Sequence, residues 1–210
     1  MTLREFIDRH GQKAFNLYLF VNLAGWLGYQ AYTAWREGRF DYIEAAFTLQ
    51  NLVMVVLILV RKDHITVDRN VLHQGVALAA FFSGVFFTGA AESTGEAALT
   101  VSKTVIMTAN VLGLISLINL GRSFGILIAY REVRRTGLYS VVRHPMYGTD
   151  ILLRAGYLIS HPAPAVFALF VISSAAYVYR AVLEERFLVT KSGYREYMSD
   201  VRYRFIPYIY

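Results

Sequence analysis

The chain has 210 residues, of which 56% are hydrophobic and 17% charged, and its formal net charge is +6 at pH 7. This balance is too apolar for an ordinary soluble domain and fits one compact bundle of membrane helices. The chain has no cysteine, which excludes disulfides, thiolate metal sites and cysteine nucleophiles. Its five histidines are scattered without a His-x-x-x-His pair, so the sequence predicts no metal site.

Five apolar segments are long enough, or nearly so, to cross a hydrocarbon core of roughly 30 Å. Four of them are uncharged over 18 or more positions: residues 14–35, 70–91, 104–121 and 155–179. The fifth, residues 45–60, has 16 positions and can span if its flanking charges extend toward the interface. The sequence therefore predicts an all-α fold, a polytopic membrane helix bundle with about five to six spans.

The first two segments contain amide side chains that favour hydrogen bonds between helices over ligand binding: Asn16, Asn22, Gln30, Gln50 and Asn51. Further along, residues 146–182 are predicted to form a helical hairpin, because Pro162 and Pro164 oppose helix continuation at a turn. Arg154 lies inside this hairpin, and Asp150 four residues earlier is its expected ion-pair partner.

The positive charges are distributed unevenly between the two sides of the predicted bundle. If the spans alternate and the hairpin returns the tail, 17 of the 21 Lys and Arg residues lie on one side. Such an excess is typical of the cytoplasmic side, so we expect a cytoplasmic N-terminus. The basic charge thus reflects membrane topology, with an attraction to anionic lipid head groups, and indicates no nucleic-acid partner.

The candidate site residues begin at Arg143-His144-Pro145. Pro145 suits the first turn of a helix, whose free N–H groups attract an anion, and His144 would lie beside them. The alternative is that His144 merely caps the helix. Arg180 and Glu184 are four residues apart and share a helix face near membrane level. They either form a simple interfacial ion pair or bind a ligand.

Other residues near these positions have plainer expected roles. Tyr139 follows Gly137 in a predicted turn and offers a flat ring to a flat ligand or to the membrane interface. Glu185 points to a different helix face from Glu184 and is expected to be solvated. Tyr194 and Tyr197 are expected to lie in an interfacial aromatic belt.

These pieces, taken in order, resemble the isoprenylcysteine carboxyl methyltransferase family of integral-membrane methyltransferases. The matching motifs lie in about the last 90 residues: Gly121-Arg122-Ser123-Phe124, Thr136-Gly137-Leu138-Tyr139, Arg143-His144-Pro145-Met146-Tyr147, Arg180-x-x-x-Glu184-Glu185, Gly193-Tyr194-Arg195-Glu196-Tyr197 and Arg204-Phe205-Ile206-Pro207. The resemblance implies two parts, with N-terminal transmembrane helices over residues 1–120 and a catalytic region over residues 121–210. The spans before residue 104 resemble the family only as generic helices.

The resemblance further implies transfer of a methyl group from S-adenosylmethionine to a lipophilic, membrane-embedded acceptor, in a pocket on the cytoplasmic side. It places Arg180 at the acceptor as the catalytic residue. It places the following residues around the cofactor: Arg131, Val133, Arg134, Tyr139, His144, Pro145, Met146, Tyr147 and Glu184. Residues 125–136 are shorter than in the family, and Ala129 stands where the family often has Gln. The acceptor class therefore stays open among prenylated, quinone-like, phenolic and fatty-acid-derived molecules. A carboxylate or a hydroxyl is the expected methylated group, and the acceptor atom stays open among oxygen, nitrogen and sulfur.

Two alternatives remain at this stage. One is a membrane lipid reductase of the sterol-reductase type, which would use NADPH, although the sequence has no Gly-x-Gly-x-x-Gly motif. The other is a non-enzymatic membrane subunit that binds lipid, in which His144 and Glu184 are structural. Binding of S-adenosylmethionine, of a nicotinamide cofactor, or of neither distinguishes the three hypotheses.

Overall fold

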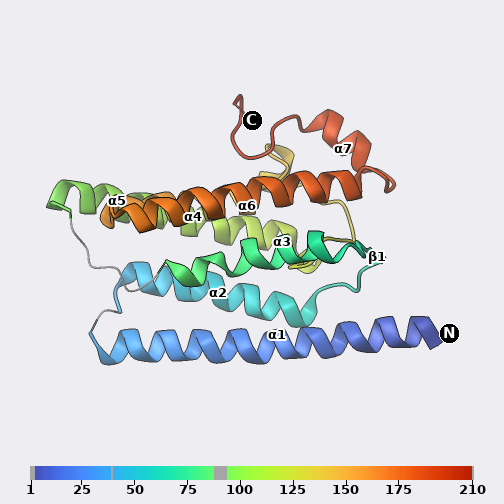
Figure 1. Ribbon diagram of the computed structural model, residues 1–210, viewed down its shortest axis with the longest axis horizontal. Helices are drawn as coiled ribbons and strands as arrows, with labels where there is room; N and C mark the ends of the chain where they lie inside the picture. The colour runs from blue at the N-terminus through green and yellow to red at the C-terminus, as the bar shows by residue number, and fades with distance from the viewer. Residues whose placement is uncertain (1–2, 39, 88–93, 210) are drawn as a thin grey trace.

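The computed structural model describes residues 3–38, 40–87 and 94–209 and contains seven α-helices there, of which the six longer ones run roughly along one axis (Figure 1). Short 3₁₀ turns (η) and two short strands connect them. The elements in chain order are α1 (Leu3–Arg36), α2 (Tyr42–Val60), β1 (Thr66–Val67), α3 (Val71–Phe82), η1 (Ser83–Phe86), α4 (Glu96–Leu120), η2 (Gly121–Ser123), β2 (Ala129–Tyr130), η3 (Gly137–Ser140), α5 (Pro145–Ser160), α6 (Pro164–Leu188) and α7 (Tyr194–Asp200).

Local chemistry explains where several of these helices begin. The Asp41 side chain accepts hydrogen bonds from the first free N–H groups of α2, and Asn70 does the same for α3. Pro145 and Pro164 occupy the first turns of α5 and α6, where a missing N–H costs nothing. The predicted hairpin is therefore confirmed, with its turn between Ser160 and Pro164.

Three described helices are long and apolar enough to cross a membrane: Tyr42–Val60, Glu96–Ser123 and Pro164–Leu188. The apolar helix Val71–Phe86 is shorter, and residues 88–93 of the predicted 70–91 segment lie outside the described residues. Helix α1 covers the predicted 14–35 segment, but its Asn and Gln residues make it less apolar than the three spans. Of the five to six predicted spans, three are thus supported.

Apolar side chains on the outer faces of these spans are consistent with lipid contact. On α2, Leu49, Leu52, Val56 and Leu59 recur every three or four residues and are each about half exposed. A soluble protein rarely leaves such a stripe uncovered, whereas in a bilayer it faces acyl chains. We therefore describe the chain as an integral membrane protein.

The connecting segments that carry most of the basic residues gather at one end of the bundle. Figure 1 shows the N-terminus, β1 and α7 at this end, while the end of α1 and the starts of α2 and α4 lie at the other. Strand β1 pairs antiparallel with β2, with Thr66 opposite Tyr130 and Val67 opposite Ala129. This short ladder, not foreseen by the all-α prediction, fastens residues 125–136 to the loop after α2.

Candidate active site

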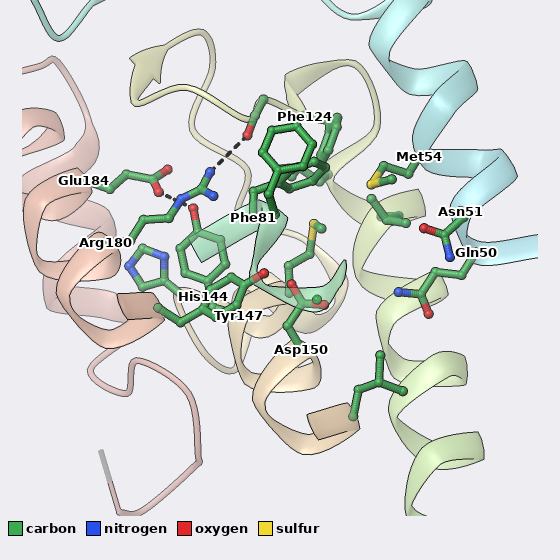
Figure 2. A pocket seen from close by; sticks show the side chains of 18 of the residues that line it. Gln50, Asn51, Met54, Phe81, Phe124, His144, Tyr147, Asp150, Arg180 and Glu184 are labelled. Atoms are coloured by element: carbon green, nitrogen blue, oxygen red, sulfur yellow. Dashed lines mark hydrogen bonds between the residues drawn. The ribbon is translucent and has the colours of Figure 1, made fainter. Parts of the chain in front are cut away.

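One cavity of about 990 Å³ extends between the helices and is lined by residues from both halves of the chain. Figure 2 shows Arg180, Glu184 and Tyr147 on one side of this cavity, and Gln50 and Asn51 of α2 on the opposite side. Its volume is at the upper end of the roughly 300–1,000 Å³ usual for small-molecule sites. A large ligand, or two smaller ones, can therefore fit inside.

Glu184 and Tyr147 form the most direct side-chain contact at the cavity wall. The Tyr147 hydroxyl donates a hydrogen bond to Glu184 Oε2 over 2.5 Å, and both side chains line the cavity. The same contact joins α6 to the first turn of α5. The carboxylate keeps further lone pairs with which it can accept hydrogen bonds from a ligand.

Arg180 contacts backbone carbonyls and an aromatic ring, and does not form the simple ion pair with Glu184 that its spacing allowed. Its guanidinium donates to the backbone carbonyls of Ala77 (2.9 Å) and Ile126 (2.6 Å), and it lies 4.9 Å from the centre of the Tyr147 ring. No ion pair joins it to Glu184 among the described residues. Arg180 thus fastens α6 to α3 and to residues 125–128, while its buried Nε has no hydrogen-bond partner there and remains available.

Glu185 is not solvated, and that prediction is wrong. Its side chain is 4% exposed and accepts hydrogen bonds from Arg143 Nε (2.7 Å) and Arg204 Nε (2.9 Å). His144 Nε2 lies 3.1 Å from the same carboxylate. The sequence prediction treated α6 as having one buried face near its end, whereas α5 and the C-terminal segment cover a second face.

His144 precedes α5 as expected but does not cap it with its side chain. Its ring stacks on the Tyr147 ring at 5.2 Å between centroids and lines the cavity. The backbone N–H groups of Arg143 and His144 donate to the carbonyls of Tyr203 (2.9 Å) and Arg204 (2.8 Å). The C-terminal segment therefore holds the start of α5 in place, which the terminal Arg-Phe-Ile-Pro motif alone did not indicate.

The predicted turn around Gly137 brings Tyr139 to the cavity. Gly137 has a φ of 61°, and a Cβ at this position would collide with Asn119 Oδ1. That same oxygen accepts the backbone N–H of Leu138 over 2.8 Å. Burial raises the pKa of the Tyr139 phenol well above its usual range, so the hydroxyl stays protonated and can donate a hydrogen bond.

Two tyrosines assigned to an aromatic belt are instead part of the site. Tyr194 and Tyr197 of α7 are 4% and 2% exposed and line the cavity. Tyr197 Oη donates to the Tyr139 carbonyl over 2.8 Å. The belt prediction is wrong because α7 folds back over η3, a long-range contact that periodicity does not reveal.

Residues 131–134 border the cavity at the end of the bundle where β1 and α7 lie. Arg131 Nε donates to the Lys62 carbonyl over 3.0 Å, and its guanidinium lies against Gly125, where a Cβ would collide with it. Burial lowers the pKa of Arg131, although Glu184 and Asp63 oppose this effect, and the group remains a cation. Arg134 Nε donates to Ser123 Oγ over 3.2 Å.

The expected ion pair between Asp150 and Arg154 is not what the structure contains. Arg154 Nη1 donates to the backbone carbonyl of Asp150 over 2.8 Å, and Nη2 donates to Ser83 Oγ over 3.1 Å. The guanidinium also lies 4.8 Å from the centre of the Tyr177 ring. Backbone and ring contacts thus accommodate this cation, and the Asp150 carboxylate lines the cavity.

The fold gathers nearly all residues selected from the sequence around this one cavity. Pro145 is buried at the start of α5 and does not line it. No group of three or more potential metal-ligating side chains occurs in the part of the chain that the structure describes. The selected residues that line the cavity are Arg131, Val133, Arg134, Tyr139, His144, Met146, Tyr147, Arg180 and Glu184.

Part of the chain matches a known protein family. Residues 97–195 match the model of the phospholipid methyltransferase family, a stretch from the first turn of α4 to the start of α7. No curated protein matches the chain. The matched region contains every selected residue of the cavity wall and extends further toward the N-terminus than the resemblance seen in the sequence. Residues 97–195 thus match the phospholipid methyltransferase family, the same integral-membrane methyltransferase family as isoprenylcysteine carboxyl methyltransferase.

Proposed function

We propose that this chain transfers a methyl group from S-adenosylmethionine to a carboxylate or hydroxyl oxygen of a lipophilic acceptor that enters from the membrane. The observation that carries this proposal is the composition of the cavity wall. One end combines a carboxylate, cations and stacked aromatic rings, and the wall continues between apolar helices toward α2. A polar cofactor and an apolar acceptor need such neighbouring environments.

The donor set at the polar end fits the proposed cofactor. The Glu184 carboxylate would accept hydrogen bonds from ribose hydroxyls, and Tyr139 would lie against the adenine. His144, together with the free N–H groups at the start of α5, would hold the methionine carboxylate. When bound, the cofactor supplies a methyl group already activated by its positively charged sulfur.

The remaining task of the protein is to position the acceptor and exclude water. Arg180 lies beside Tyr147, and its unpartnered Nε would orient the acceptor oxygen. A carboxylate acceptor carries no proton to lose, whereas a hydroxyl acceptor needs a base. Residues 121–210 would form the catalytic region and residues 1–120 the membrane scaffold, with the polar end facing the cytoplasm.

Calorimetric titration of S-adenosylhomocysteine into detergent-purified protein tests the cofactor. We expect micromolar binding that His144→Ala abolishes. His161→Ala is the matched control, because His161 lines the same cavity and stacks on Tyr157 instead. Absence of binding to the folded parent protein would refute the proposal, and NADPH would then be titrated.

Two variants separate the cofactor from the acceptor. Glu184→Gln keeps the shape of the side chain but removes its charge, so binding of S-adenosylhomocysteine should weaken about tenfold or more. Arg180→Ala should retain that binding yet lose transfer of labelled methyl groups from S-adenosylmethionine into a total membrane lipid extract. If both variants bind and turn over like the parent, this face of α6 has been assigned wrongly.

A further inference from the structure

The cavity contains a second polar region, on the opposite side from Arg180 and Glu184. Gln50 of α2 projects into the cavity in Figure 2, and Asn110 of α4 also lines it. Both helices are candidate membrane spans. Neither residue belongs to the motifs from which the site was identified, and the sequence had suggested that Gln50 only bonds a neighbouring helix.

The amides of this second region lack partners. Asn110 is 2% exposed, and neither its Oδ1 nor its Nδ2 has a hydrogen-bond partner among the described residues. Gln50 Oε1 is likewise buried and unpaired there. Asn51, the next residue, differs from them, because its Nδ2 donates a hydrogen bond to the Phe47 carbonyl of the same helix over 2.8 Å. Unpaired polar atoms at membrane depth are costly, so a ligand is the natural partner.

Gly113 creates the space that Gln50 occupies. A Cβ at this position would lie 2.8 Å from Gln50 Nε2 and 2.9 Å from Gln50 Oε1, so the amide rests directly on the α4 backbone. Asn110 is three residues before Gly113 and therefore on the same face of α4. The two amides thus line the same cavity next to one turn of α4, and we call this region the polar notch.

We infer that Gln50 and Asn110 bind a neutral hydroxyl group carried by the acceptor at a point away from the atom that is methylated. The two amides are uncharged and offer both donors and acceptors, which matches a hydroxyl, itself both donor and acceptor. A purely hydrocarbon chain would leave these atoms unsatisfied and is disfavoured. This inference rests on the proposed function and narrows its acceptor to hydroxylated lipids.

A matched pair of lipids tests the inference. Methyl ricinoleate and methyl oleate differ only by a hydroxyl in the middle of the acyl chain, and each is titrated into the detergent-purified full chain by calorimetry. The parent should bind methyl ricinoleate about tenfold more tightly, as expected from one or two net hydrogen bonds. Equal affinity of the parent for the two esters would overturn the inference.

Three variants test whether the preference for methyl ricinoleate over methyl oleate arises at Gln50 and Asn110. Asn110→Leu replaces the unpaired amide by an apolar group of similar size, so the preference should vanish while affinity for methyl oleate is kept. Gly113→Ala displaces Gln50 and should also reduce the preference. Asn51→Leu is the control, because its amide is already bonded within α2 and the preference should persist. A preference that survives Asn110→Leu would exclude this notch as its source.

Folding and cofactor binding are checked separately. Because Asn110→Leu removes two unsatisfied buried atoms, its thermal midpoint without ligand should equal or exceed that of the parent. Binding of S-adenosylhomocysteine should be unchanged in all three variants. If the parent does not bind S-adenosylhomocysteine, the proposed function is refuted. If the parent binds S-adenosylhomocysteine but has equal affinity for the two esters, only the hydroxyl subsite is refuted.

Discussion

Glu185→Gln should distinguish Glu185, which holds the site together, from its neighbour Glu184, which we propose to bind the ligand. Glu185 is the common partner of Arg143 and Arg204, whose side chains are 7% and 24% exposed. The substitution keeps the size of the side chain but leaves these cations without their counter-charge. The docking of the C-terminal segment against α5 depends on the same contacts.

The expected loss of stability in Glu185→Gln follows from the burial of these side chains. Removing one partner of a buried ion pair typically costs about 3–5 kcal/mol, because a charge is left uncompensated. For a chain of this length, about 1 kcal/mol shifts the thermal midpoint by about 2–4 °C, so the expected decrease is about 6–20 °C. Thermal unfolding in detergent, followed by tyrosine and tryptophan fluorescence, measures this decrease.

Glu184→Gln is the matched comparison, because it makes the same chemical change one residue earlier on α6. Glu184 accepts from the neutral Tyr147 hydroxyl and lines the cavity, so its variant should unfold within a few degrees of the parent. If Glu185→Gln unfolds at the parent's temperature, or if the two variants are destabilised equally, the distinction between a structural and a ligand-binding carboxylate is refuted.

Two further predictions concern residues outside the spans. Gly137→Ala should lower stability by about 2–4 kcal/mol, because a left-handed φ costs about 1–2 kcal/mol and the new Cβ collides with Asn119. Gly38→Ala is the control, with a φ of 68° but nothing within 4 Å, and equal losses in thermal unfolding would exclude the collision. Although partial burial opposes it, hydrogen bonds from the Asn70 backbone N–H and from His73 lower the pKa of Asp68. The stability from Asp68 is therefore present above the usual carboxyl pKa of about 4 and is lost below it. Asp68→Asn should flatten this acid-side loss, and an unchanged pH profile of the thermal midpoint would contradict the assignment.

Different parts of the chain form the two sides of the cavity. Its polar end is made by α5, α6 and the segments that cover them, and its opposite wall is made by α2 and α4. The family match begins within α4 and therefore covers the polar end and only part of the opposite wall. Acceptor selectivity would thus depend on residues inside the matched region, such as Asn110, and on residues outside it, such as Gln50.

Much of the architecture is determined by the sequence alone, because it depends on local chemistry. Long apolar segments must be helical in a membrane, since the backbone has no other way to satisfy its hydrogen bonds. Proline at positions 145, 162 and 164 defines the start of α5 and the hairpin turn for the same local reason. The order of the C-terminal motifs was sufficient to indicate the methyltransferase family, and the family match over residues 97–195 confirms it.

Only the tertiary structure decided which polar residues serve the scaffold and which face the cavity. Glu184 and Glu185 are adjacent in sequence, yet one lines the cavity and the other is surrounded by cations from segments 42 and 19 residues away. The spacing of charges along a single helix cannot reveal this, because the partners come from elsewhere in the chain. The same holds for Gln50, whose amide lies against Gly113, three residues from Asn110 on α4, because α2 packs on α4.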